Sequence, residues 1–491
     1  MEGDFLLAYK DLREFISALE QRRLLKRITA EVDCELEITE ITDRVSKMKG
    51  EDNVALLFEN VRGYDMPVLM NAFGSYERMA LALGVEKLDD VADEISQLLR
   101  LPYISFSHKM DLVKLIPMMK NAINFPKYVS NAPCQEVIEK DNPTLDILPI
   151  LKCWPQDGGP FVTLPLVFTK NPATDKRNVG MYRLQKYDAV TTGMHWHIHK
   201  NGAENYRDAK ERGMTRIEAA VAIGTDPVLT YAATAPMPRD IDEMVFAGFL
   251  RHKSVELTKC VTVNLEVPAT SEIVLEGYVD VNETRREGPF GDHTGYYSLA
   301  DDYPVFHITC ITHRKNPIYA ATIVGRPPME DCYIAKATER IFLPLLRQML
   351  PEIVDINMPL EGVFHDCIIV SIKKQFPMHA RKVMHALWGM GQMMNVKMIV
   401  VVDSHVDVQD MSEVAWRVFN NIDARHDFEI VEGPLDVLDH SSPMAKWGAK
   451  LGIDATKTWP EEGHAREWPD EIKMSDEIKA RVDERWKEFG L

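Results

Sequence analysis

Two acidic residues, Glu287 and Asp292, lie in a segment with three glycines, one proline, one histidine and two tyrosines, residues 285–297. Glycine tolerates positive φ and proline fixes φ, so this composition favours a rigid, non-helical loop. A carboxylic acid that donates a proton near neutral pH needs a raised pKa, and two acids bridged by an arginine can divide the roles. Arg183 is a candidate for the bridge, but spacing in the sequence gives no distance. The composition alone also fits a surface turn with solvated acids.

The second candidate is a histidine-rich segment, in which His195, His197 and His199 alternate with Trp196 and Ile198. On a β-strand the three imidazoles would project from one face, about 7 Å apart between neighbours, and could converge on a metal ion. The same spacing fits a half-exposed strand with solvated imidazoles, although histidine is the commonest metal ligand. A flavin-free, cupin-like metal enzyme is therefore one alternative for this chain.

A third segment, residues 235–243, is a proline-rich turn before a helix predicted over residues 243–250. Acids at a helix start cap the helix and complement its dipole, so a structural role is sufficient for this segment alone. The sequence lacks GxGxxG, P-loop, HExxH and GxSxG motifs, which excludes the usual dinucleotide, NTPase, zincin and serine-hydrolase sites. The seven cysteines are scattered without a CxxC pair and predict neither a disulfide framework nor a zinc knuckle.

The composition predicts a multidomain globular protein of the cytoplasm. Of 491 residues, 45% are hydrophobic and 27% are charged, with no secretory signal and no apolar run of about 18 residues. The formal net charge of -18 disfavours nucleic acid as a partner, because phosphate backbones attract basic surfaces. For the same reason, a phosphorylated cofactor would need a bridging cation or a local cluster of basic residues.

The pattern of apolar residues predicts the elements that position these candidates. We expect a small N-terminal α/β region, a central β-barrel or sandwich, a C-terminal α/β domain and a terminal helix, over residues 1–125, 126–330, 331–465 and 466–491. Helical spacing predicts helices over residues 11–27 and 109–119. Residues 228–233 fit a strand of the central domain, and residues 367–372 and 398–403 fit buried strands of the C-terminal domain.

Several motifs follow one another in a characteristic order. The long ones are NVGMYR, HWHIH, VPATSEIVLEG and EGPFGDHTGYY, at residues 178–183, 195–199, 267–277 and 287–297, with shorter ones at 10–15, 153–155, 325–328 and 452–457. Together they closely resemble the UbiD family of reversible decarboxylases, in particular its quinone-biosynthesis branch. The resemblance implies a central flavin-reductase-like split β-barrel that binds prenylated FMN, flanked by the N-terminal region and a C-terminal oligomerisation domain. It also implies Mn²⁺ or Mg²⁺, often with K⁺, in agreement with the charge argument.

The resemblance also implies roles for individual residues. The metal ligands would be Asn178, Glu243 and His199, with His197 as the alternative histidine. The catalytic network would be Arg183, Glu287 and Asp292. Further cofactor contacts would come from Met181, Tyr182, Arg183, His195, Trp196, His197, Lys200, Asn201 and, from the third domain, Lys397. Asp292 would protonate the substrate carbon after CO₂ leaves; some relatives carry Glu there, and Asp matches the branch that acts on quinone precursors.

The implied reaction is a non-oxidative decarboxylation in ubiquinone or menaquinone biosynthesis, of 4-hydroxy-3-polyprenylbenzoate or a hydroxynaphthoate. Loss of CO₂ from an aromatic ring leaves a carbanion that ring resonance does not stabilise, and prenylated FMN supplies the electron sink. A (de)carboxylase of other hydroxyarenes and a flavin-binding protein without turnover are the alternatives. A flavin prenyltransferase would supply the cofactor. A polyprenyl substrate would require an apolar channel or transient contact with the inner face of the membrane, and we expect a homo-oligomer, from dimer to hexamer.

Overall fold

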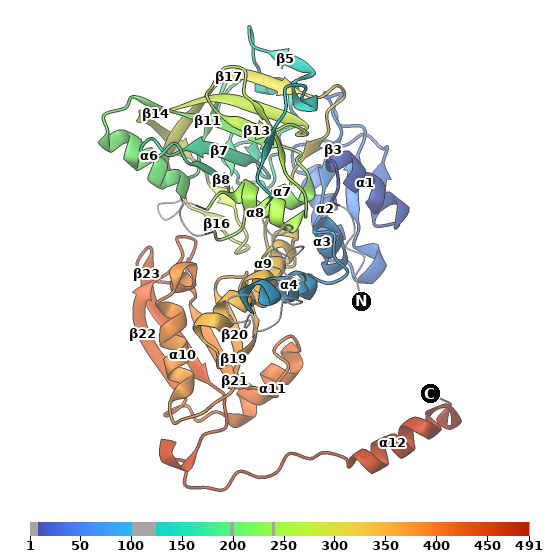
Figure 1. Cartoon of the computed structure of the whole chain (residues 1–491), viewed down its shortest axis with the longest axis vertical. Helices are drawn as coiled ribbons and strands as arrows, with labels where there is room; N and C mark the ends of the chain where they lie inside the picture. The colour runs from blue at the N-terminus through green and yellow to red at the C-terminus, as the bar shows by residue number, and fades with distance from the viewer. Residues whose placement is uncertain (1–7, 101–123, 197–200, 238–240, 491) are drawn as a thin grey trace, which may run out of the picture.

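The computed structural model describes residues 8–100, 124–196, 201–237 and 241–490. Figure 1 shows an N-terminal region beside a central β-rich domain, a third domain below them, and a terminal helix apart from all three. The helix predicted over residues 109–119 lies outside the described residues. Within the described ranges, no helix is both long enough and apolar enough to span a membrane.

The N-terminal region contains a four-stranded sheet in the order β1–β2–β3–β18. Its elements are α1 (Leu12–Gln21), β1 (Leu25–Ile28), α2 (Glu37–Ser46), β2 (Ala55–Phe58), β3 (Val68–Met70), α3 (Tyr76–Ala82), α4 (Leu88–Arg100) and β18 (Tyr319–Ala320). The prediction of one helix over residues 11–27 is wrong at its end, because Arg23 adopts a φ of 62° and the chain then enters β1. Since β18 follows the central domain in the chain, this sheet joins the two regions.

The central domain contains a seven-stranded antiparallel sheet in the order β10–β17–β14–β11–β7–β8, with β5 paired to β17. Its strands are β5 (Val137–Glu139), β7 (Leu166–Lys170), β8 (Arg177–Met181), β10 (Thr191–Gly193), β11 (Arg216–Ile223), β14 (Ile273–Glu287) and β17 (Asp301–His313). The pairing of β14 with β17 extends from Ile273 opposite His313 to Glu287 opposite Asp301. No pairing among the described strands joins the edges β8 and β10, so the described part of the predicted barrel is an open sheet.

Three helices accompany this sheet: α6 (Asn201–Glu211), α7 (Pro227–Ala232) and α8 (Glu243–Leu250). The prediction of a strand over residues 228–233 is wrong, because this segment forms α7. The Asp226 side chain accepts a hydrogen bond from the N–H of Val228 at 2.8 Å, and Pro227 occupies the first helical position. A capping acid followed by proline starts a helix even where the apolar run is buried on all sides. The bounds predicted for α8 are confirmed.

The third domain contains a five-stranded sheet in the order β19–β20–β21–β23–β22. Its elements are β19 (Ile353–Asn357), β20 (Cys367–Ile372), α10 (His379–Trp388), β21 (Met398–Asp403), α11 (Met411–Asn421), β22 (Phe428–Pro434) and β23 (Trp447–Asp454). The predicted strands at 367–372 and 398–403 are confirmed, and they pair in parallel. Buried strands of this kind are continuous runs of branched apolar residues, which is why the sequence shows them clearly.

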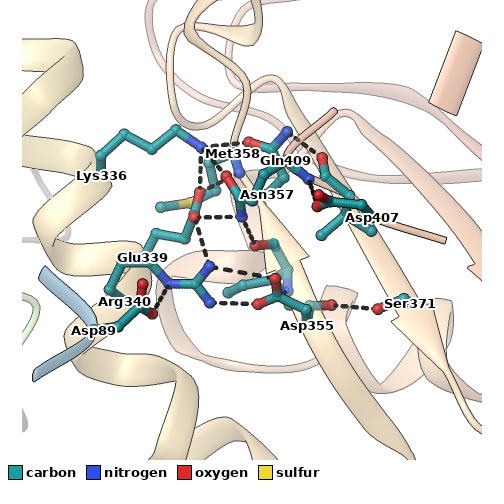
Figure 2. Close-up of polar contacts among 12 residues, drawn as sticks. Asp89, Lys336, Glu339, Arg340, Asp355, Asn357, Met358, Ser371, Asp407 and Gln409 are labelled. Atoms are coloured by element: carbon teal, nitrogen blue, oxygen red, sulfur yellow. Dashed lines mark hydrogen bonds and ion pairs between the residues drawn. The ribbon is translucent and has the colours of Figure 1, made fainter. Parts of the chain in front are cut away.

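The long helix α9 (Glu330–Met349) connects the central domain to the third domain. Figure 2 shows its polar side chains directed at β19 and at the loop that holds Gln409. The ammonium group of Lys336 donates to Glu339 Oε2 at 2.8 Å, to Asn357 Oδ1 and to Gln409 Oε1 at 3.3 Å. Arg340 Nε lies 3.2 Å from Asp89 Oδ1 of α4. This cluster joins α9 to the third domain and to α4.

The C-terminal helix α12 (Asp476–Arg485) extends away from the third domain (Figure 1). A short helical turn, Trp486–Phe489, follows it. We call residues 472–490 the terminal segment. Its large apolar side chains are exposed, including Ile472 at 100% and Met474 at 61% of their surface, just before α12. The segment therefore contributes little to the core of its own chain.

Candidate active site

Arg183 connects the two acids of the loop. Its Nε donates to Glu287 Oε1 at 3.1 Å, and its Nη1 donates to Asp292 Oδ2. Its Nη2 donates to Ser298 Oγ at 3.1 Å, and the guanidinium carbon lies 4.4 Å from the centre of the Phe290 ring. Both carboxylates are almost completely buried. The fold thus brings together the three residues for which the sequence suggested a joint role.

The loop is held in place by backbone contacts. After β14 it forms a hairpin of two short strands, β15 (Phe290–Gly291) and β16 (Tyr297–Ser298). The Asp157 carboxylate accepts hydrogen bonds from the N–H of Gly291 at 2.7 Å and from the N–H of Trp154 at 2.8 Å. Gly288 has a φ of 92°, which favours glycine, and its N–H donates to Gln185 Oε1 at 2.7 Å. These contacts agree with the rigid loop predicted from composition and not with the alternative, a surface turn with solvated acids.

The charge of Asp292 depends on its two neighbours. Burial acts to raise its pKa, but the positive charge of Arg183 and hydrogen bonds from His293 outweigh burial and hold the pKa well below its usual range. Burial acts to lower the pKa of Arg183, and the charges of Asp292 and Glu287 reverse this effect and raise it. The resting site therefore holds Asp292 as a carboxylate rather than as an acid.

His195 forms the next contact of this network. Its Nδ1 lies 2.6 Å from Glu287 Oε1, and its ring lies 4.1 Å from the Tyr303 ring, centre to centre. Burial and the nearby charge of Arg183 lower the pKa of His195, so the neutral imidazole is favoured. A Cβ atom on Gly193 would lie 2.7 Å from Glu287 Oε2, which explains a glycine at the end of β10. His195 thus takes part in orienting Glu287.

Asn178 and Glu243 are the two predicted metal ligands within the described residues. Glu243 Oε2 accepts a hydrogen bond from the N–H of Val179 at 3.0 Å, so α8 places this acid against β8 beside Asn178. Burial raises the pKa of Glu243 to about 7. Asn178 Nδ2 is buried and has no hydrogen-bond partner in the described part of the chain. The described residues contain no group of three or more His, Cys, Asp or Glu that could hold a metal.

The remaining predicted contacts are distributed as follows. Three of them lie outside the described residues: His197, His199 and Lys200. Tyr182 and Trp196 are buried, Met181 is half-buried, and Asn201 is the first residue of α6. Lys397 is engaged within the third domain, where its ammonium group donates to Asp439 Oδ2 at 2.6 Å and to Ser441 Oγ. The structure therefore places Lys397 with Asp439 and not with the Arg183 network.

Four residues that contact the network or its loop carry no mark of their own in the sequence: Asp157, Ser298, Tyr303 and His365. Asp157 lies two residues after the motif at residues 153–155, and this proximity is the available signal. His365 lies in the third domain, and its Nε2 is 2.7 Å from His293 Nε2 of the loop. No pattern around His365 marks it, because only the folded arrangement of two domains brings it to the loop.

Comparison with known families covers most of the chain. Three family profiles described as the N-terminal, the Rift-related and the C-terminal domain of 3-octaprenyl-4-hydroxybenzoate carboxy-lyase, named UbiD_N, UbiD and UbiD_C, match residues 16–98, 127–327 and 332–455. An uncharacterized protein of Archaeoglobus fulgidus is 54% identical over 485 residues, which cover 98% of this chain and 99% of that protein. An uncharacterized protein of Aquifex aeolicus is 49% identical over 484 residues, with coverage of 98% and 99%.

Solved structures share the whole architecture. Vanillic acid decarboxylase of Sedimentibacter hydroxybenzoicus in its closed form gives a TM-score of 0.86 at 29% identity, over 98% of this chain and 99% of that chain. The UbiD-class enzyme HmfF of Pelotomaculum thermopropionicum in complex with FMN gives 0.80 at 28% identity, over 96% and 99%. An evolved dimeric form of HmfF in complex with prFMN gives 0.78 at 26% identity, over 97% and 100%.

Proposed function

Because this chain belongs to the UbiD family, we propose that it is a prenylated-FMN-dependent carboxy-lyase that removes CO₂ from an aromatic carboxylic acid. The observation that carries the proposal is the buried arrangement in which Arg183 contacts both Glu287 and Asp292. In such an arrangement a proton-donating acid lies beside charges that adjust its pKa. Family membership favours this reaction over the flavin-free metal enzyme considered for the histidine-rich segment.

The residues around the site fit a phosphorylated cofactor with a divalent cation. The side-chain oxygen of Asn178 and the carboxylate of Glu243 are hard donors that suit Mn²⁺ or Mg²⁺, and the buried Asn178 Nδ2 still has a hydrogen bond to donate. Met181, Tyr182, Arg183, His195 and Trp196 would line the cofactor, with His197, His199, Lys200 and Asn201 completing the site. When bound, prenylated FMN supplies an electron sink for the carbon that loses CO₂.

The roles of the chain's own residues follow from their contacts. The bond between the ring carbon and the carboxylate breaks, CO₂ leaves, and the ring carbon takes a proton from Asp292. Arg183 and Glu287 hold the Asp292 side chain at the position from which the proton is delivered. Because Arg183 favours ionised Asp292 at rest, the site also needs a source that protonates Asp292 during turnover.

The physiological substrate in this proposal is a precursor of ubiquinone or menaquinone, either 4-hydroxy-3-polyprenylbenzoate or a hydroxynaphthoate. Aspartate at position 292 supports this branch. The second candidate is another hydroxyarene carboxylate, supported by the likeness to vanillic acid decarboxylase. A polyprenyl chain would require an apolar path or transient contact with a membrane, and we expect the active form to be a homo-oligomer.

The test starts with co-expression of the chain and a flavin prenyltransferase. Mass spectrometry identifies the bound cofactor, and CO₂ release is then screened over hydroxybenzoates and naphthoates, with and without a prenyl chain. We expect Asp292→Asn to retain the cofactor and to lose at least about 10²-fold of the rate. Asp302→Asn, at an exposed acid, is the matched control. Full activity of Asp292→Asn would reject its role, and loaded enzyme inactive on every acid would reject the function.

A further inference from the structure

A histidine pair connects Asp292 to the third domain. His293 Nδ1 lies 2.9 Å from Asp292 Oδ1, on the carboxylate oxygen that Arg183 Nη1 does not contact. On the other side of the ring, His293 Nε2 lies 2.7 Å from His365 Nε2, and the two rings are nearly perpendicular at 88°. Three titratable groups therefore follow one another at hydrogen-bonding distances.

The hydrogen-bond roles restrict where the protons lie. A carboxylate only accepts, so His293 Nδ1 carries the proton of the first hydrogen bond. The contact between the two Nε2 atoms needs one proton, on either His293 or His365. With the Nε2 proton on His365, Asp292 takes the proton from His293 Nδ1 while His293 Nε2 receives one from His365. His365, whose side chain is 16% exposed, then regains a proton from water, and rotation of the His293 ring returns its remaining proton to the side of Asp292. Each transfer breaks one N–H or O–H bond and forms another, so the proton count balances.

The surroundings of His293 favour a positive charge on its ring. Asp292 lies against His293, and Asp331 of α9 and Asp436 of the third domain act on it from farther away. Burial acts to lower the pKa of His293, but the hydrogen bond with Asp292 and the acidic neighbours outweigh burial and raise it. The Phe364 ring lies 4.8 Å from the His293 ring and excludes water from that side. Asp366 Oδ1 lies 3.1 Å from His365 Nδ1 and can share the charge.

The two histidines belong to different domains. His293 lies in the hairpin after β14, whereas His365 lies in the turn before β20, where Val363 and Phe364 have φ values of 41° and 54°. A second contact between the same two domains places the Tyr296 ring against the His440 ring, with ring centres 3.9 Å apart and planes tilted by 35°. The path from Asp292 through His293 to His365 is therefore complete only while the two domains are in contact.

We propose that His293 and His365 form an interdomain proton relay that recharges Asp292 in each turnover. The relay deepens the decarboxylase function proposed above and rests on it. The relay supplies the proton that Asp292 needs. Arg183 holds Asp292 as a carboxylate, and a carboxylate must receive a proton before it can deliver one. His365 acts through His293, so it is a relay residue rather than one that contacts the substrate.

The first test separates proton transfer from hydrogen bonding. His365→Gln can still hydrogen-bond to His293 but cannot exchange protons, and His365→Ala leaves space for a free imidazole. With the loaded enzyme and a substrate from the CO₂ screen, we expect both variants to lose at least about tenfold in kcat with little change in KM. We expect added imidazole to restore His365→Ala and not His365→Gln. His426→Gln, an exposed histidine of the third domain, is the matched control.

Two outcomes would overturn the relay: His365→Gln with the kcat of the unchanged enzyme, or no recovery of His365→Ala with imidazole. A folding defect cannot imitate imidazole recovery, because the same protein sample is compared with and without imidazole.

The second test does not depend on turnover. Nuclear magnetic resonance of the ¹³C-histidine-labelled full chain should show that the titration curve of His293 changes in His365→Gln, because the two rings contact each other. Identical His293 titration curves in both proteins would reject the relay even if CO₂ release is confirmed. A His293 curve that depends on His365, in a loaded enzyme that releases no CO₂, would instead reject the decarboxylase function and leave the pair established.

Discussion

At the scale of residues, Arg183 determines the state of the candidate active site. It is the positive charge that Glu287 and Asp292 share, and both acids are buried where an isolated carboxylate is costly. Arginine suits this position because its planar fork contacts both acids and Ser298 at once. A lysine at the same place would supply the charge but could not reproduce the three contacts.

We predict that Arg183→Met destabilises the protein by about 3–5 kcal/mol at pH 8, because two buried carboxylates lose their counter-charge. Without Arg183, burial dominates and the pKa of Asp292 rises above its value in the unfolded chain. A raised pKa of an acid favours folding below that pKa, so the loss of stability should shrink as the pH falls toward 5. Urea unfolding at both pH values measures this, with Arg286→Met at an exposed arginine as control. An equal loss at both pH values would contradict the expected rise in pKa.

The sequence identifies the two acids and the arginine as candidates, but it does not give the distances between them. Arg183 and Asp292 are 109 positions apart, and Gly291 and Asp157 are 134 apart, so their contacts depend on how β8, β9 (Leu184–Gln185) and the hairpin meet. The resemblance to a family supplied the pairing that spacing could not. The contact between His293 and His365, 72 positions apart, had no signal at all, because it forms between domains.

At the scale of elements, local patterns predicted what local forces decide. The strands β20 and β21 and the helix α8 were found from their apolar runs and spacing. The pattern of residues 228–233 predicts a strand where the structure has α7, because a short, fully buried apolar run has the same sequence pattern in a strand and in a helix. The capping residue Asp226 is the local signal that favours the helix. The charges of Lys336 and Glu339 on α9 are buried, and the local sequence gives no indication of their partners.

We predict that the cluster on α9 holds the third domain in place (Figure 2). Lys336→Met should cost about 3 kcal/mol, because it removes the nearer of the two cations that contact the buried Glu339 carboxylate and leaves only Arg340 Nη1, 3.6 Å away. Adding Glu339→Gln should recover part of this loss, since the amide carries no charge, and a double-mutant cycle over the four proteins measures the coupling. Thermal unfolding serves as the readout, and Lys479→Met on the exposed α12 is the control. Strictly additive effects would show that the two side chains do not depend on each other.

At the scale of the whole molecule, the domains are linked by shared elements rather than by linkers alone. Strand β18 returns from the central domain to the N-terminal sheet, and α9 contacts both α4 and β19. His293 and His365 lie where the central and third domains meet, so in the proposed relay this interface takes part in the chemistry. The terminal segment from Ile472 onward is the exception, because it stands apart from this body (Figure 1).

We predict that this terminal segment packs on a second copy of the chain. The ion pairs of residues 472–490 in the described structure are made within the segment or with the neighbouring Glu471. Its apolar side chains are exposed, as Trp486 at 49% and Phe489 at 47% show, and Phe419 on α11 is 81% exposed. A second copy would cover such surfaces, in line with the homo-oligomer proposed above.

The double variant Trp486→Ala, Phe489→Ala should therefore shift the mass in solution toward the monomer, whereas the neighbouring Lys487→Ala should not. Analytical ultracentrifugation over a range of concentrations measures the shift, and deletion of residues 472–491 should produce it more strongly. The interior of each subunit should be unaffected by the double variant, because the two side chains lie outside the core, so its circular dichroism should be unchanged. An unaltered mass for the deletion would reject the prediction that this segment holds subunits together.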